Sequence, residues 1–299
     1  MADLAIDVRG LVKHYGSTMA LDGLDLQVEA GTVAGFLGPN GAGKSTTIRI
    51  LLGLHRASGG QAQVFGRDPF RDAVELHRRL AYVPGDVALW PRLTGGQVID
   101  LLLGLRGVRN APRREEMIER FELDPTRRAS TYSKGNRQKV ALVAAFAADT
   151  DLLVLDEPTS GLDPLMEAQF QLCTRESADR GTTVLLSSHI LAEVQQLCDT
   201  VTIVRSGRAV LAGRLNELRS VTRSRLTAIV AAGAEALHRL EGVHDLAIDG
   251  DRVTCTIDDA ATAEVVAAIA ALRPSALTIE PPSLEELFLR QYGASAETA

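Results

Sequence analysis

The hydrophobic positions in the first two thirds of the chain form short continuous runs that alternate with longer helical patterns. Residues 32–37 and 151–155 are short, largely apolar runs, typical of strands that a parallel sheet buries on both faces. Three stretches between them have the length and apolar spacing of helices: residues 97–105, 113–123 and 134–147. We therefore expect an α/β core with a helical subdomain inserted over about residues 86–150.

Residues 1–30 have the pattern of an antiparallel β-hairpin. Strands are predicted over residues 5–8 and 24–28, with turns at Tyr15-Gly16 and Asp22-Gly23. Further strands are expected at residues 61–65, 79–83, 182–187, 201–204 and 208–211, and further helices at residues 44–54, 164–178 and 190–198. Residues 1–220 are therefore predicted to join an antiparallel β subdomain to the α/β core.

After residue 220 the predicted order changes to β-α-β-β-α-β. The expected strands and helices cover residues 226–231, 234–240, 243–248, 252–257, 261–272 and 276–280. Asp249-Gly250, between the two central strands, is a strong hairpin signal. This order is that of a small α+β ferredoxin-like domain, expected over residues 221–293 and followed by a tail over 294–299.

Composition narrows the classes of function. With 299 residues, the chain is long enough for one large domain or for a large and a small one, and its 45% of apolar residues suffice for a buried core. Its net charge of −6 argues against nucleic acid as a partner, because phosphate binding needs clustered Lys and Arg. The cysteines Cys173, Cys198 and Cys255 are too few for a disulfide framework and indicate buried thiols in a reduced, cytoplasmic compartment. No secretory signal is expected at the N-terminus. The apolar runs are shorter than the ~20 residues that cross a bilayer, so any membrane role would need a separate partner chain.

A glycine-rich segment after the first buried strand has the spacing of a phosphate-binding P-loop. It consists of Gly38, Pro39, Asn40, Gly41, Ala42, Gly43, Lys44, Ser45 and Thr46. Glycines let backbone N–H groups turn toward a triphosphate, and the N-terminus of the following helix favours negative charge. Lys44 can reach the β- and γ-phosphates, and the Ser45 hydroxyl can complete a magnesium shell. The chain is therefore predicted to bind a nucleoside triphosphate with Mg²⁺.

Two carboxylates follow the second buried strand. Asp156 ends this strand, where its carboxylate can hold magnesium through a water molecule. Glu157, one residue further, is placed to orient or deprotonate an attacking water. This pair predicts hydrolysis of the bound nucleotide; an ordinary acidic strand end is the alternative.

These motifs occur with several others in a fixed order, and together they resemble the nucleotide-binding subunit of an ATP-binding-cassette (ABC) transporter over about residues 4–220. Residues 132–138 resemble the family's signature loop, residues 160–163 the loop after the catalytic glutamate, and residues 187–189 the loop with the switch histidine. The resemblance implies a P-loop NTPase (RecA-like) core that uses ATP. It also implies a homodimer in which two subunits sandwich two ATP molecules.

The resemblance assigns roles to individual residues. Ser133 and the Gly135 amide would donate to the γ-phosphate of the ATP held by the partner copy. Asp163 would couple the two sites, and His189 would stabilise charge on the γ-phosphate or the attacking water. Tyr15 falls where the family stacks an aromatic ring on adenine, with a turn tyrosine packing on its own loop as the alternative.

Two departures from the family pattern bear on activity. A magnesium- and water-binding glutamine usually follows the strand before the helical subdomain, but Gly85 stands at that position and Asp86 follows it. Asp86 or a water molecule would have to fill this role. The signature loop also has Lys134 and Asn136 where glycine and glutamine are commonest. Because the catalytic glutamate and the switch histidine are both present, we expect an active ATPase, with nucleotide binding and negligible turnover as the alternative.

Two further segments indicate what process the energy of ATP hydrolysis drives. Residues 90–95 fall where transporters of this family form the groove for a permease's coupling helix, although Trp90 folded on its own subdomain is equally consistent. Residues 282–289 resemble the end of exporter ATPases of the daunorubicin-resistance type, whose small C-terminal domain packs against its copy. The amphipathic helix expected over residues 284–289 can dock on this chain's own cassette or on a second copy.

The resemblance thus implies an ATP-hydrolysing subunit that powers efflux of a drug, an antibiotic or another hydrophobic compound through a separate permease. It also implies a peripheral place at the cytoplasmic face of the cell membrane. The competing hypothesis is a soluble cassette ATPase with a regulatory or mechanochemical role and no membrane partner.

Overall fold

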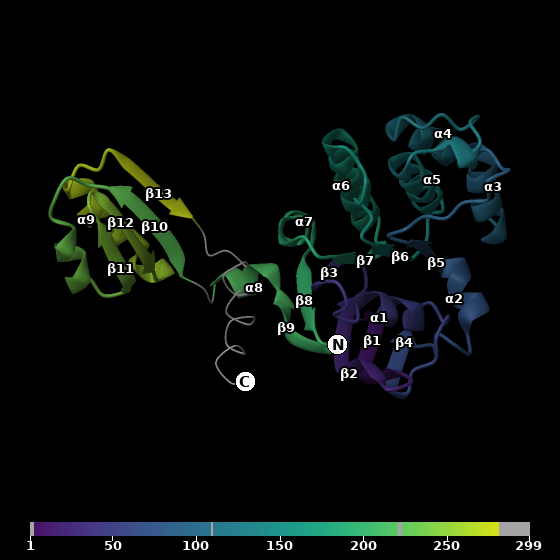
Figure 1. The fold of residues 1–299 in the computed structure, drawn as a ribbon, viewed down its shortest axis with the longest axis horizontal. Helices are drawn as coiled ribbons and strands as arrows, with labels where there is room; N and C mark the ends of the chain where they lie inside the picture. The colour runs from purple at the N-terminus through teal and green to yellow at the C-terminus, as the bar shows by residue number, and fades with distance from the viewer. Residues whose placement is uncertain (1–2, 109, 221–222, 281–299) are drawn as a thin grey trace. The chain divides into compact units, whose positions relative to one another are not determined.

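A computed structural model describes residues 3–108, 110–220 and 223–280. The chain divides into two compact units, Met1–Gly213 and Arg214–Ala299 (Figure 1). The predicted domain limits at residues 220 and 293 stay predictions.

A six-stranded sheet forms the centre of the first unit. Its strand order is β5-β6-β7-β3-β8-β9, and the pairs β5–β6, β6–β7, β7–β3 and β3–β8 are parallel. The strands are β3 (Val33–Leu37), β5 (Leu80–Val83), β6 (Leu152–Asp156), β7 (Thr183–Ser188), β8 (Thr200–Arg205) and β9 (Arg208–Arg214). Every residue of β3, β6 and β7 is buried, which confirms the parallel core predicted from the continuous apolar runs.

A three-stranded antiparallel sheet with the order β2-β1-β4 forms the second layer of this unit. Its strands are β1 (Leu4–Tyr15), β2 (Thr18–Glu29) and β4 (Gly59–Val64). The turn predicted at Tyr15-Gly16 joins β1 to β2, but the turn predicted at Asp22-Gly23 is wrong, because both residues lie inside β2. Gly23 has a φ of 76° and lies beside a shift in the register between β1 and β2. This glycine therefore serves a β-bulge rather than a chain reversal.

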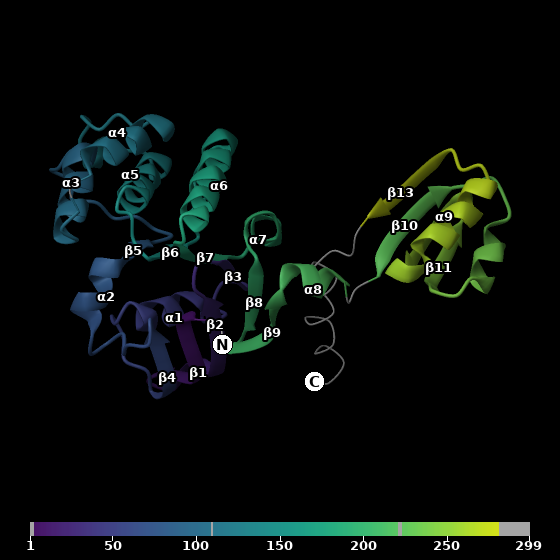
Figure 2. The same cartoon turned by 180° about the vertical axis from the view of Figure 1, so that it is seen from behind.

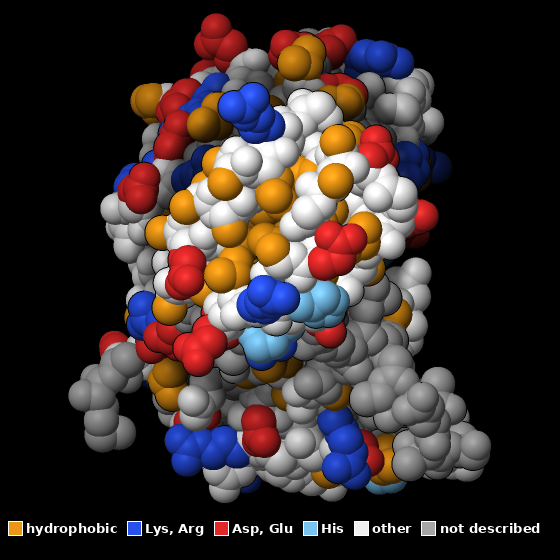
Figure 3. Space-filling model, turned by 90° about the vertical axis from the view of Figure 1, so that its left-hand side faces the viewer, with side chains coloured by type: hydrophobic (Ala, Val, Ile, Leu, Met, Phe, Trp, Pro, Cys, Tyr) orange, Lys and Arg blue, Asp and Glu red, His pale blue; other side chains and the backbone are white. Residues whose placement is uncertain are grey.

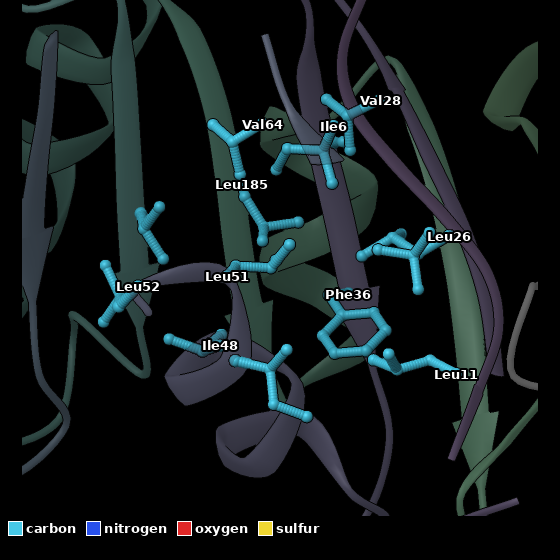
Figure 4. Packing of buried hydrophobic residues seen from close by; sticks show 14 of the residues in the cluster. Ile6, Leu11, Leu26, Val28, Phe36, Ile48, Leu51, Leu52, Val64 and Leu185 are labelled. Carbon is cyan, nitrogen blue, oxygen red and sulfur yellow. The ribbon is translucent and has the colours of Figure 1, made fainter. Parts of the chain in front are cut away.

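The helix α1 (Lys44–Leu51) follows the P-loop and is part of the main hydrophobic core. Its residues Ile48 and Leu51 belong to one buried cluster with Ile6 of β1, Phe36 of β3 and Leu185 of β7 (Figure 4). The helix is thus packed between the antiparallel and the parallel sheet. This packing fixes its N-terminus relative to the ends of the parallel strands.

Six more α-helices complete the described part of the first unit. They are α2 (Ala73–Arg79), α3 (Gly95–Leu105), α4 (Ala111–Arg120), α5 (Lys134–Phe146), α6 (Pro164–Asp179) and α7 (Leu191–Leu197), with a 3-10 turn η1 (Ala129–Thr131). In both views α3, α4 and α5 lie together, apart from the antiparallel sheet, as the predicted helical subdomain (Figures 1 and 2). The hydrophobic pattern does not reveal α2, because Leu76 is its one buried residue.

The second unit contains a four-stranded antiparallel sheet with the strand order β11-β12-β10-β13. Its elements are α8 (Leu215–Ser220), β10 (Ser224–Ile229), η2 (Ala234–Arg239), β11 (Val243–Asp249), β12 (Arg252–Ile257), η3 (Asp259–Ala261), α9 (Thr262–Ala271) and β13 (Ala276–Glu280). Their order agrees with the predicted one, except that η2 is a short 3-10 helix where the pattern predicts an α-helix. The ferredoxin-like assignment stays a prediction, and the helix expected over residues 284–289 lies outside the described residues.

One face of this sheet has its own small core. Leu226 and Val253 from the strands belong to a buried cluster with Val265 and Ile269 of α9. Figure 3 shows one face of the molecule, with apolar and uncharged surface at its centre and charged side chains around the margin. Among the helices of both units that the structure describes, none is long and apolar enough to cross a bilayer.

Candidate nucleotide-binding site

The P-loop connects the end of β3 to α1, and its glycines are required by their surroundings. A Cβ atom at position 38 would lie 2.4 Å from the carbonyl oxygen of Val204. Gly43 has a φ of 110°, and a Cβ atom there would lie 2.7 Å from Cδ2 of Leu21. No side chain caps α1 and no acidic residue lies in its first turn. Its N-terminal amides and positive dipole end therefore suit an anion such as a phosphate.

Lys44 holds its ammonium group at the P-loop. Its side chain is 5% exposed, and Nζ donates to the carbonyl oxygens of Gly38 at 2.6 Å and Pro39 at 3.1 Å. Burial lowers the pKa of Lys44, while the nearby charges of Glu157 and Asp156 act in the opposite direction. The lysine is thus a fixed cation next to two carboxylates.

Ser45 and Asp156 meet beside the P-loop, and their oxygen atoms are of the kind that binds magnesium. The Ser45 hydroxyl donates to Asp156 Oδ2 at 3.1 Å, although the two residues lie 111 positions apart in sequence. The other carboxylate oxygen, Oδ1, is buried without a hydrogen-bond partner among the described residues. Burial and the Asp156 charge raise the pKa of nearby Tyr82 to about 12. A hydroxyl and a carboxylate with one unsatisfied buried oxygen fit a hydrated Mg²⁺.

Glu157 and His189 come from the ends of neighbouring parallel strands. The Glu157 amide donates to the Ser187 carbonyl at 2.9 Å, which continues the pairing of β6 with β7. Oε1 of Glu157 lies 3.2 Å from Nδ1 of His189 and 3.8 Å from Nζ of Lys44. Glu157 has a φ of 49°, an uncommon backbone conformation for a residue with a side chain. The structure therefore brings the predicted catalytic pair together at the P-loop lysine.

Gly85 lies close to the same strand end. A Cβ atom at this position would be 3.0 Å from the Asp156 carbonyl oxygen and 3.4 Å from Cβ of Glu157. The neighbouring Asp86 is exposed, and its carboxylate makes no hydrogen bond or ion pair with the part of the chain that the structure describes. The chain thus has little room for a side chain where the family usually places glutamine.

The signature loop contacts the loop after Glu157 within the same chain. Ser133 caps α5 by accepting a hydrogen bond from the Asn136 amide at 3.2 Å, and Lys134 Nζ donates to Ser160 Oγ at 2.7 Å. A Cβ atom on Gly135 would lie 2.4 Å from the Gly161 carbonyl oxygen. This glycine is therefore required by its own chain as well as by any approaching phosphate.

The described residues show no hydrogen bond or ion pair between the signature loop and the P-loop of the same chain. Asp163 caps α6, accepting from the amides of Leu165 at 3.1 Å and Met166 at 3.0 Å. Within one chain, Asp163 and the two signature residues are thus explained as helix-terminal residues. Their predicted roles across a dimer stay predictions.

Tyr15 lies at the end of β1 and is 42% exposed. Its hydroxyl is hydrogen-bonded to Nδ1 of His55, and the two rings meet edge to face with centroids 5.7 Å apart. Nζ of Lys13 lies 5.0 Å from the centre of the tyrosine ring. The His55 contact joins segments 40 positions apart, and no sequence motif indicates it.

An apolar groove of about 540 Å³ lies between the end of α1, α2 and α3. Its lining residues are Leu52, Gly53, Leu54, Ala73, Val74, His77, Arg78, Leu102, Leu105 and Arg106. Leu54, Val74 and Leu105 expose 59%, 76% and 72% of their surface. Trp90, in the loop before α3, is 51% exposed. These side chains form apolar surface that the first unit leaves uncovered.

The sequence matches two family models. One, described as ABC transporter, matches residues 21–160, and the other, described as ATP-binding protein DrrA1-3-like, C-terminal domain, matches residues 213–292. The daunorubicin resistance ATP-binding protein DrrA3 of Streptomyces coeruleorubidus is 38% identical over 98% of this chain and 97% of its own length. The daunorubicin/doxorubicin resistance ATP-binding protein DrrA of Streptomyces peucetius is 39% identical over 98% and 94%. A solved ATP binding subunit of an ABC transporter superposes with a TM-score of 0.67 at 30% identity, covering 72% of this chain and 92% of that one.

Proposed function

This chain belongs to the ATP-binding subunits of ABC transporters, and on that premise we propose that it powers an exporter through a separate membrane permease. The family and its solved members make the chain an ATP-hydrolysing cassette. One observation carries the assignment of catalytic roles: Glu157 lies between Lys44 and His189, beside the Ser45–Asp156 pair.

The roles follow from this geometry. The P-loop amides and Lys44 bind the β- and γ-phosphates, while Ser45 and Asp156 would hold Mg²⁺. When bound, the metal ion neutralises negative charge on the phosphate oxygens. Glu157 orients the attacking water and accepts its proton, and His189 donates a hydrogen bond that stabilises charge on the γ-phosphate.

A homodimer would complete each site. Ser133 and Gly135 lie at the N-terminus of α5, where amides can donate to a phosphate, but within one described chain they make no bond to the P-loop. A second copy can bring this helix end to the γ-phosphate, with Asp163 at the shared interface. The C-terminal unit is proposed to regulate or strengthen this dimer, in keeping with its DrrA-like match.

The permease is proposed to bind the apolar groove between α1, α2 and α3, together with the region around Trp90. Leu54, Val74 and Leu105 expose apolar side chains there that a membrane subunit's helix can cover. This contact would place the protein peripherally at the cytoplasmic face of the cell membrane. The relatives named for daunorubicin resistance favour a drug or another hydrophobic compound as the cargo.

The test is to purify the tagged full-length chain from detergent-solubilised native membranes and identify the proteins that come with it. The proposal predicts a multi-span membrane protein in equal amount. Leu105→Asp in the groove should abolish this recovery, whereas Leu172→Asp on α6, an exposed leucine outside the groove, should retain it. Recovery of the chain from the soluble fraction alone would instead favour a soluble cassette ATPase.

A further inference from the structure

The carboxylate of Glu193, on α7, is bound by two hydroxyl groups: one lies in the loop that follows β6, and the other on the last residue of β7, where the loop to α7 begins. Thr159 Oγ1 donates to Oε1 at 2.5 Å, and Ser188 Oγ donates to Oε2 at 2.5 Å. The Ser188 hydroxyl also accepts a hydrogen bond from the Ile190 amide at 2.9 Å. Each carboxylate oxygen thus holds one loop, and the two loops are held together by one side chain.

The two loops carry the proposed catalytic pair. Thr159 lies two residues after Glu157, and Ser188 directly precedes His189. Backbone bonds fix the inner part of this arrangement, since the Glu157 amide donates to the Ser187 carbonyl and the Ser160 amide donates to the Glu157 carbonyl. Beyond this Glu157–Ser187 bond, no further backbone hydrogen bond joins the two segments among the described residues. The Glu193 carboxylate joins the two segments through side-chain hydrogen bonds, past the point where backbone bonds of the sheet join them.

We propose that Glu193 is a positioning residue that fixes the spacing between Glu157 and His189. This role rests on the proposed function, in which these two side chains align the attacking water and the γ-phosphate. Holding reacting groups in a defined geometry contributes strongly to catalysis, and a misplacement of about 1 Å can reduce the rate hundredfold. Loss of the Glu193 carboxylate should therefore slow hydrolysis more than it weakens ATP binding.

A purely local role for Glu193 explains less of what is observed. An acidic residue in the first turn of α7 interacts favourably with the helix dipole. Both carboxylate oxygens, however, accept from hydroxyls of the two catalytic loops. A further carboxylate, Glu167 of α6, lies near enough that the Glu193 charge contributes to raising its pKa, after burial. Two hydroxyl donors offset this unfavourable charge environment.

The test compares purified full-length variants in ATP turnover, ATP affinity and thermal stability. Glu193→Ala should lower kcat about tenfold or more, with KM for ATP and Tm close to those of the wild type. Gln196→Ala is the matched control, because Gln196 lies on the same helix and its side chain accepts from Gln171 instead. It should leave kcat unchanged.

A second pair of variants tests the same link from the other side. Thr159→Val removes the donating hydroxyl at nearly constant volume, and Thr159→Ser retains it. The proposal predicts a lower kcat for the valine variant and recovery toward wild type for the serine variant. This pair decides the outcome if Glu193→Ala does not fold.

Two results would overturn the proposal. One is a wild-type kcat in folded Glu193→Ala or Thr159→Val, and the other is a loss of kcat that a parallel loss of ATP affinity or Tm accounts for. The variant Glu157→Gln distinguishes a failure of the Glu193 proposal from a failure of the proposed function. If wild type and Glu157→Gln release phosphate equally, the catalytic assignment itself fails; if they differ as expected, Glu193 is tested alone.

Discussion

Glu157 and His189 meet across the ends of β6 and β7, with Oε1 and Nδ1 3.2 Å apart. Parallel pairing of the two strands brings these residues together, although 31 other residues separate them in sequence. The carboxylate is also 3.8 Å from the buried ammonium of Lys44. In the proposed mechanism the carboxylate accepts the proton of the attacking water and the imidazole donates a hydrogen bond to the γ-phosphate, so this arrangement places both groups at the P-loop lysine.

Glutamine at position 85 should damage this chain rather than improve it. Its Cβ atom would lie 3.0 Å from the Asp156 carbonyl oxygen, so the end of β6 would have to move. We expect Gly85→Gln to lower the free energy of unfolding by about 1–3 kcal/mol and to reduce ATP turnover, measured by thermal unfolding and phosphate release.

Asp86→Ala serves as the control, because this neighbour is exposed and its substitution should leave stability unchanged. The Mg²⁺ dependence of ATP turnover in Asp86→Ala also shows whether Asp86 takes the place of the missing glutamine. Higher turnover in Gly85→Gln at unchanged stability would contradict the steric account.

Tyr15 provides a test of nucleotide affinity. If its ring stacks on adenine, Tyr15→Ala should weaken ATP binding by about 1–3 kcal/mol, measured by titration calorimetry. Tyr15→Phe retains the ring but loses the hydrogen bond to His55, so it should bind nearly as well as the wild type. Equal affinity in Tyr15→Ala and wild type would instead support a tyrosine that packs on its own loop.

The link between α4 and α6 should make stability depend on pH. Arg120 donates to both carboxylate oxygens of Glu176, at 2.6 and 2.7 Å, and these bonds lower the pKa of Glu176 from its usual 4.5. A lowered carboxylate pKa stabilises the fold above pH 4.5, and this contribution is lost as pH falls through the folded-state pKa.

At pH 7, Glu176→Gln should therefore lower the free energy of unfolding by about 0.5–1 kcal/mol, a small value because Glu176 is partly exposed. The difference from wild type should shrink as the pH falls from 4.5 through the lowered folded-state pKa. Glu75→Gln, which breaks a single-bond pair with Arg67, should have a smaller effect at pH 7. A difference that grows toward acid pH would contradict the sign of this linkage.

Local sequence patterns predict the parts of this fold that depend on local chemistry. The fully buried strands β3 and β6 have continuous apolar sequences, and the P-loop glycines are fixed by backbone geometry, so both are found where expected. Asp22-Gly23 misleads because a glycine with positive φ suits a β-bulge as well as a turn. The short η2 has the apolar spacing of an α-helix but too few residues to establish one.

The supporting contacts of the site could not be predicted in this way. His55 beside Tyr15 and Glu193 beside Thr159 belong to no motif, and each contact depends on tertiary packing of segments more than thirty residues apart. Gly135 also shows that a sequence motif can give only part of the reason for a residue. The motif assigns it to a phosphate, whereas the structure gives a second reason, the carbonyl oxygen of Gly161 in the same chain.

The measurement that tests the central claim most directly is phosphate release by wild type and Glu157→Gln, combined with detection of ATP-bound dimers. Wild type should hydrolyse ATP, and Glu157→Gln should turn over about a hundredfold more slowly while retaining ATP and accumulating as a dimer. Lys44→Ala, which removes the P-loop cation, should show neither binding nor dimers. Equal phosphate release by wild type and Glu157→Gln, or no release by wild type even with membrane partners, would contradict the account.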